Sequence, residues 1–233
     1  MRHEINESPI NPLPMTVWIL VLPIIISEIV FGLGQAGVIG GAQGVGLRLT
    51  AMQHAAFAPE MVQRMWQVGV VDWSQLYRLL SFSFIHVNFT RAAFVVVFTL
   101  ALGNMVAREF KPRSVLALFF GSAIGGALIY TVIMTLIRAP LEPLIGGYPA
   151  VYGLVGAFTF LLWARLAAAN ANRMRAFTLI GMLLLFQLVF GLVFGGAGYG
   201  WIAEIAGFFC GFGLSFLLVD GGIKRAVYHI RQR

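Results

Sequence analysis

Long apolar runs alternate with shorter polar stretches six times along the chain. They cover residues 15–40, 84–107, 114–137, 145–166, 177–194 and 201–219. Each run is close to the roughly 20 residues that a helix needs to cross about 30 Å of hydrocarbon. The alternating ten-residue pattern of a membrane β-barrel is not seen. The pattern therefore predicts an all-α membrane protein, in which six spanning helices form one domain over residues 15–219.

The connection between the first two apolar runs, residues 41–80, is long and mostly polar. Within it, residues 59–70 place Met61 and Met65 four apart, against charged and amide neighbours, which predicts an amphipathic helix at the headgroup boundary. Aromatic residues suited to that boundary recur in the same stretch: Trp66, Trp73 and Tyr77. We expect a large interfacial loop between the first and second spanning helices.

Composition supports a membrane location and narrows the chemistry. The chain is 59% hydrophobic and only 11% charged, which is more apolar surface than a soluble globule of this size can bury. Its single cysteine, Cys210, excludes an internal disulfide and a thiolate metal cage. The sequence predicts no metal and no cofactor. It also predicts no nucleic-acid partner, because membrane topology accounts for the net charge of +7.

Cations gather on one side of the predicted helices. Eleven of the sixteen lie there: Arg2, Arg108, Lys111, Arg113, Arg165, Arg173, Arg175, Lys224, Arg225, Arg231 and Arg233. The positive-inside rule then predicts cytoplasmic termini, with a short lead (residues 1–14) and a basic tail (residues 220–233). The tail is read as a topological anchor, or as a contact with anionic lipid or a cytoplasmic partner. The expected location is a bacterial inner membrane or an equivalent one.

Glu28 lies within the first apolar run, where a carboxylate is costly unless it is paired. We expect its side chain to face the bundle or a water-filled cavity. Two roles remain open for it, a helix–helix hydrogen bond and a proton or ion site.

Residues 146–157 are the most distinctive stretch. Gly146, Gly147 and Pro149 disfavour a regular helix before residue 150, and Pro149 suits a first helical turn. Gly153 and Gly156 then leave one helix face almost without side chains, which lets another helix approach closely in lipid.

This stretch resembles the signature of the rhomboid intramembrane proteases, in which a Gly-x-Ser-Gly turn opens a small-residue helix. The resemblance is close from Ala150 to Ala157. It departs at the turn, where Tyr148 stands at the serine position and Pro149 at the next glycine. The Tyr77–Arg78 pair before the second helix is similar to the Trp/Tyr-Arg pair of these proteins.

Two further segments resemble the family but differ from it at positions that would carry the chemistry. His86 matches the first histidine before the second helix, but Arg91 and Val95 occupy the places of the histidine and asparagine that help to hold the oxyanion. In the last run, Gly207 and Gly211 keep the family's close contact with the fourth helix. Glu204 stands where the family has its catalytic histidine.

The resemblance implies a six-helix rhomboid-like bundle without the catalytic dyad. It suggests a non-catalytic protein that binds transmembrane helices of a client, or serves as a subunit or assembly factor of a membrane complex. The alternatives are a serine protease with an unorthodox nucleophile, such as Ser83 near His86, and a transporter, for which no inverted repeat is found.

Arg91 and Glu204 would converge near the vestigial site on such a scaffold. Their opposite charges predict a buried ion pair, which Tyr148 could cap with its hydroxyl. In the other possibility, each charge finds a different partner or reaches the interface.

Overall fold

The computed structural model describes residues 13–184 and 198–219, and the elements below are those of this part of the chain. Five helices are long and apolar enough to cross a membrane. They are α1 (Met15–Gln35), α5 (Phe89–Ala107), α6 (Pro112–Leu136), α7 (Tyr148–Ala168) and α9 (Gly200–Leu218). The all-α membrane architecture is thus confirmed within the described residues. Most of the predicted span at residues 177–194 lies outside them, as do residues 1–12 and the tail at residues 220–233.

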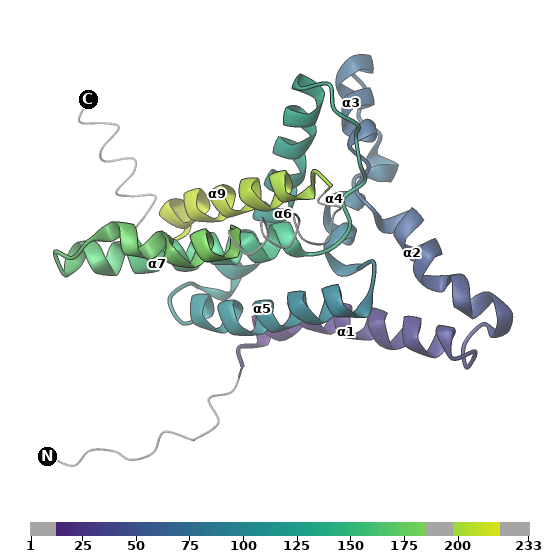
Figure 1. Ribbon diagram of the computed structural model, residues 1–233, viewed down its shortest axis with the longest axis horizontal. Helices are drawn as coiled ribbons and strands as arrows, with labels where there is room; N and C mark the ends of the chain where they lie inside the picture. Colours follow the sequence, from purple (N-terminus) through teal and green to yellow (C-terminus); the bar gives the residue numbers. More distant parts are fainter. Residues whose placement is uncertain (1–12, 185–197, 220–233) are drawn as a thin grey trace, which may run out of the picture.

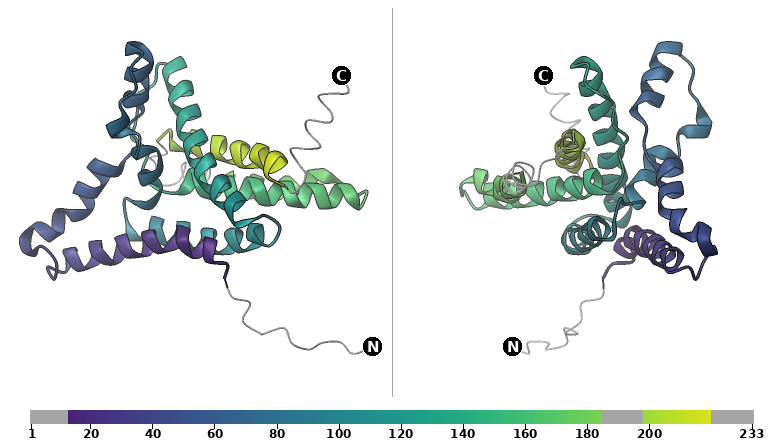
Figure 2. Two further views of the ribbon diagram at one scale, coloured as in Figure 1. Left: turned by 180° about the vertical axis from the view of Figure 1, so that it is seen from behind. Right: turned by 45° about the vertical axis from the view of Figure 1, so that its right-hand side comes forward.

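The spanning helices form two groups. Helices α1 and α5 lie side by side (Figure 1), while α7 and α9 pack closely together against α6. Two further views show the same arrangement (Figure 2). The buried core draws on both groups and includes Leu20 of α1, Val95 of α5 and Leu154 of α7.

The predicted bounds shift by a few residues, each for a local reason. Helix α5 begins at Phe89 instead of residue 84, because the side chain of Asn88 caps it by accepting the Arg91 backbone N–H at 2.9 Å. Helix α1 ends at Gln35 instead of residue 40, where Gly37 and Gly40 adopt positive φ angles of 74° and 72°.

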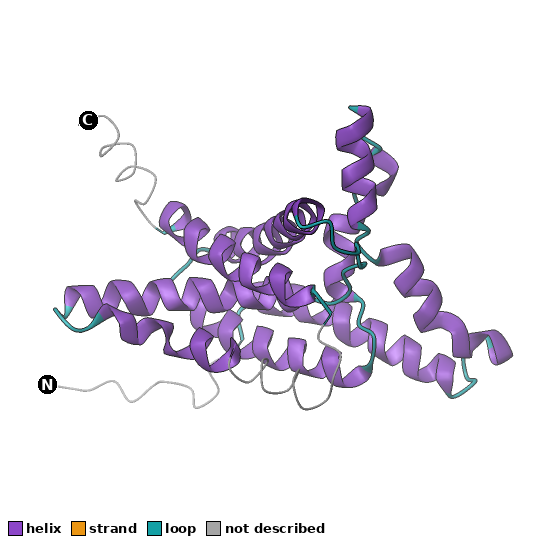
Figure 3. Cartoon of the chain, turned by 45° about the horizontal axis from the view of Figure 1, so that its top comes forward, coloured by secondary structure: helices purple, strands orange, loops and turns teal. Residues whose placement is uncertain are grey.

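The loop between α1 and α5 is largely helical (Figure 3). It contains η1 (Gly41–Gly46), α2 (Leu47–Ala55), α3 (Pro59–Val68), η2 (Trp73–Gln75), α4 (Arg78–Ser81) and η3 (Phe82–Phe84). The amphipathic helix predicted from residue 59 is present as α3. Helix α2 runs back from the far end of α1 toward the bundle, so that the two form a V (Figure 1).

The Tyr77–Arg78 pair fastens the end of α2. The Tyr77 hydroxyl donates to the carbonyl of His54 at 2.8 Å, and Arg78 Nη1 donates to the carbonyls of Gln53 and Ala56, both at 3.1 Å. Because a last-turn carbonyl has no partner within its own helix, these side chains supply the missing donors.

Candidate functional site

The turn before α7 is fixed by backbone and side-chain hydrogen bonds to the segment before α5. Gly146 has φ of 108°, a conformation that favours glycine, and its N–H donates to the carbonyl of Phe82 at 2.8 Å. The N–H of Gly147 donates to Nε2 of His86 at 3.2 Å. The turn is therefore bound to the segment that leads into α5.

His86 acts here as a neutral hydrogen-bond acceptor. Its side chain is 1% exposed, and Nδ1 is buried without a partner among the described residues. Burial lowers the pKa of His86 from 6.5 to about 4; the nearby carboxylate of Glu28 opposes this shift, and the charge of Arg48 adds to it. The imidazole is uncharged near pH 7, with Nε2 already engaged by a backbone amide.

Tyr148 is the first residue of α7 and is half-buried. The charges of Arg91, near the start of α5, and Glu204, near the start of α9, both act on its phenol. Both residues were expected near Tyr148 from the sequence. Arg91 is an exposed residue whose backbone N–H binds Asn88, and the direct ion pair between Arg91 and Glu204 stays a prediction.

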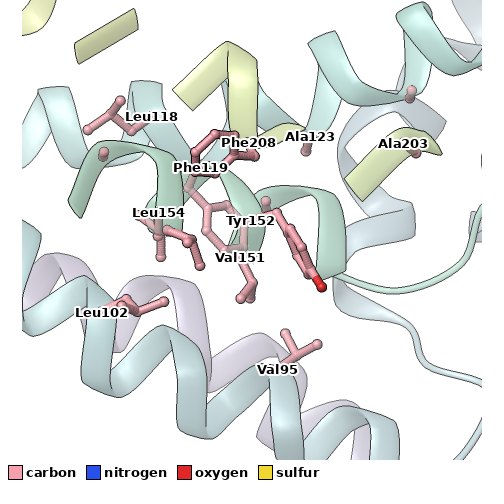
Figure 4. Close-up of a cluster of buried hydrophobic side chains, with 14 of the residues drawn as sticks. Val95, Leu102, Leu118, Phe119, Ala123, Val151, Tyr152, Leu154, Ala203 and Phe208 are labelled. Atoms are coloured by element: carbon pink, nitrogen blue, oxygen red, sulfur yellow. The ribbon is translucent and has the colours of Figure 1, made fainter. Parts of the chain in front are cut away.

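Val95 makes the neighbouring wall of this site apolar. It is fully buried, and it points from α5 toward Val151 and Tyr152 of α7 (Figure 4). A Cβ added at Gly147 would lie 2.9 Å from Val95 Cγ1, so the valine packs directly against the turn. A valine has no donor for an oxyanion, and at this position it contributes packing instead.

Glycines bring α7 and α9 into backbone contact near the same end of the bundle. A Cβ added at Gly207 would collide with the carbonyl of Pro149, and one added at Gly211 with the carbonyl of Gly153. A Cβ added at Gly156 would likewise collide with the carbonyl of Phe208. Gly153 itself faces Ser122 of α6, so the three helices meet at small residues.

No serine–histidine hydrogen bond exists within residues 13–184 and 198–219. Ser83 Oγ and His86 Nδ1 are both buried without partners, so they are not bonded to each other. The hydroxyls of Ser27, Ser81 and Ser215 donate to backbone carbonyls. In the same part of the chain, no three His, Cys, Asp or Glu side chains lie close enough together to hold a metal ion.

The structure adds Arg48, which sequence reasoning missed. Arg48 of α2 binds Glu28 of α1 through both carboxylate oxygens, at 2.7 and 2.8 Å, and donates to the carbonyl of His86 at 2.9 Å. Its guanidinium also lies 4.8 Å from the ring centre of Phe31. The helix–helix hydrogen bond considered for Glu28 is present. One sequence signal was available, since Arg48 is the only charged side chain between Glu28 and Glu60 apart from the titratable His54.

The helices and this site define a polytopic helical membrane protein. A family model described as "Rhomboid domain" matches residues 73–221, and the chain therefore belongs to the rhomboid family. It is similar to Rhomboid-like protease 1 of Toxoplasma gondii, with 28% identity over 153 residues. The aligned region is 64% of this chain and 49% of that protein, so the chain spans about half the length of this relative.

Proposed function

We propose that this rhomboid-family protein does not cleave peptide bonds and acts by binding transmembrane helices. Its partner is either a client or a membrane complex of which this chain is a subunit or assembly factor. The observation that carries the proposal is the identity of Tyr148. By resemblance, this residue holds the place of the nucleophilic serine, and Glu204 holds the place of the base.

The surroundings of Tyr148 support the proposal. A serine-type mechanism needs a nucleophile hydrogen-bonded to a base, and donors for the developing oxyanion. Val95 offers no donor, and His86 Nε2 accepts the N–H of Gly147, an interaction that holds the turn. Glu204 could accept a proton, but a carboxylate cannot relay it as the two nitrogens of an imidazole do.

The second candidate is a protease with an unorthodox nucleophile. Ser83 is the serine that lies nearest to a histidine, His86, in the sequence. The geometry disfavours it, because Ser83 is fully buried and its hydroxyl is not bonded to His86. The hydroxyls of Ser27, Ser81 and Ser215 are bonded to backbone carbonyls, and that of Ser74 is bonded to Asp72. Ser122 is buried against a neighbouring helix.

Site-specific photocrosslinking in the membrane tests helix binding. A photoreactive residue at Phe94, which is 52% exposed on the first turns of α5, should crosslink to a transmembrane segment of another protein. The control is the same residue at Arg113, which is exposed at the opposite end of the bundle. Crosslinked peptides mapped by mass spectrometry should come from apolar spans. Products only from soluble domains, or equal products at both positions, would contradict the proposal.

A further inference from the structure

A groove of about 440 Å³ lies between α3 and the chain that returns from it toward α4. Four charged side chains line it, two of each sign: Glu60, Arg64, Asp72 and Arg78. Its volume falls within the range of small-ligand sites. The charges of the lining cancel, which is unusual for a site that would attract a simple anion or cation.

The groove is built by the turns of this segment. Val62 is buried on the core side of α3, while Arg64 and Met65 face the groove. Gly69 ends the helix with φ of 73°, and its N–H donates to the carbonyl of Met65 at 2.9 Å. The reversal brings Asp72 back opposite α3.

Each sign of charge comes from one side chain that hydrogen bonds hold in place and from one exposed side chain on α3. Arg78 is held by its two Nη1 hydrogen bonds, and Nη2 makes no hydrogen bond with any residue that the structure describes. Asp72 is held through Oδ1, which accepts from the N–H and the hydroxyl of Ser74 at 3.0 and 2.6 Å. Arg64 and Glu60 lie on α3 and are exposed, as is Asp72. The groove therefore offers donors and acceptors to a ligand that carries both charges.

The apolar side of the groove points to a lipid. Met61, Met65 and Val68 follow one stripe of α3 along it. Trp66 and Trp73 follow the lining residues Met65 and Asp72 in the sequence and expose 55% and 79% of their surfaces, as aromatic residues do at a membrane boundary. A ligand that extends from the charged part would thus continue along apolar surface toward the bilayer.

We propose that this groove binds the headgroup of one phosphatidylethanolamine molecule. The phosphate would take hydrogen bonds from Arg64 and Arg78, and the ammonium would donate to Glu60 and Asp72. The balanced lining disfavours an anionic headgroup. A choline headgroup has no N–H to donate and is recognised by aromatic cages, whereas none of the residues lining this groove is aromatic.

Native mass spectrometry of the full chain tests the proposal. Detergent-solubilised protein is titrated separately with phosphatidylethanolamine, phosphatidylcholine and phosphatidylglycerol of identical acyl chains. One phosphatidylethanolamine should bind at least about tenfold more tightly than the other two, as expected for one charge-assisted hydrogen bond. Soluble phosphoethanolamine, added in excess, should compete weakly or not at all if the acyl chains contribute.

Two exposed positions allow variants that keep the fold. Arg64→Gln should weaken phosphatidylethanolamine about tenfold, and Glu60→Gln should remove its advantage over phosphatidylcholine. Arg113→Gln is the matched control, since Arg113 is an exposed arginine in the first turn of α6 and does not line the groove, and it should change nothing. Equal affinity for the three lipids, or equal effects of Arg64→Gln and Arg113→Gln, would overturn the proposal.

Discussion

Arg48 and Glu28 form a two-fold hydrogen-bonded ion pair that joins α2 to α1, with N–O distances of 2.7 and 2.8 Å. The Glu28 side chain is only 7% exposed and that of Arg48 is 23% exposed. The same guanidinium holds the carbonyl of His86, and the His86 ring holds the N–H of Gly147. The loop between α1 and α5 is thereby connected to the turn that places Tyr148.

Breaking the Arg48–Glu28 pair should destabilise the protein. Arg48→Gln leaves a mostly buried carboxylate without its partner, and we expect a loss of about 3 kcal/mol in the free energy of unfolding. The double variant Arg48→Gln/Glu28→Gln should lose less than the sum of the single variants. Steric trapping in bicelles would measure each value. The exposed pair Arg165–Glu109 is the control, and Arg165→Gln should cost under about 1 kcal/mol.

His86 should make the stability of the protein depend on pH in a defined window. Its pKa is about 4 in the folded protein, against 6.5 for a solvated histidine of the unfolded chain, so the unfolded chain binds more protons between these values. Stability should therefore be complete above pH 6.5 and fall as the pH drops toward 4, by up to about 1.4 kcal/mol per pH unit. Unfolding of the wild type and of His86→Gln would be compared across this range.

The His86→Gln variant isolates the effect of the histidine. It should remove the excess slope between pH 4 and 6.5, while other groups titrate as before. At pH values near 7, His86→Ala should cost about 1–3 kcal/mol, because the buried N–H of Gly147 loses its acceptor. Identical pH profiles for the wild type and His86→Gln would show that the histidine is not buried as described.

Gly211→Ala should force α7 and α9 apart. The added Cβ would meet the carbonyl of Gly153, and neither backbone can move without breaking the contact at Gly207. We expect a loss of about 3 kcal/mol in stability, at the upper end for overpacking. Gly213→Ala on the same helix is the control, because nothing lies within 4 Å of its added Cβ. This substitution should be neutral, or stabilising by up to about 1 kcal/mol.

The charge distribution predicts cytoplasmic termini and a loop on the opposite side. In a Cys210→Ala background, Gln67→Cys on α3 should react with an impermeant maleimide in intact cells. Ala171→Cys, which follows α7 near Arg173 and Arg175, should react only after permeabilisation. Both positions are exposed, so the comparison reports sidedness and not burial. The reverse pattern of labelling would invert the assigned topology.

Hydropathy predicted the spans well because a helix that crosses lipid must be apolar and about 20 residues long. It placed α6, α7 and α9 within a few residues of their observed bounds. It could not anticipate Arg48, because that residue pairs with Glu28 across an irregular loop whose path no periodicity encodes. It also extended the second span over residues 84–88, where the polar cap at Asn88 delays the helix.

The site was accessible to sequence reasoning only in part. Motif spacing predicted that Arg91 and Glu204 would converge near Tyr148, and this convergence stays a prediction. The hydrogen bond from Gly147 to His86 depends on a ring orientation that no spacing specifies. Spacing also does not specify that Arg78 and Asp72 line one groove, which follows from the positions of their side chains.

Loss of catalysis is the central claim, and covalent labelling combined with a cleavage assay tests it most directly. Purified protein in liposomes would be incubated with a fluorophosphonate probe and with a transmembrane substrate, beside an active rhomboid protease. We predict that no serine of this chain is labelled and that the substrate stays intact. Labelling at a single serine, accompanied by cleavage and abolished with it when that serine is changed to alanine, would contradict the account.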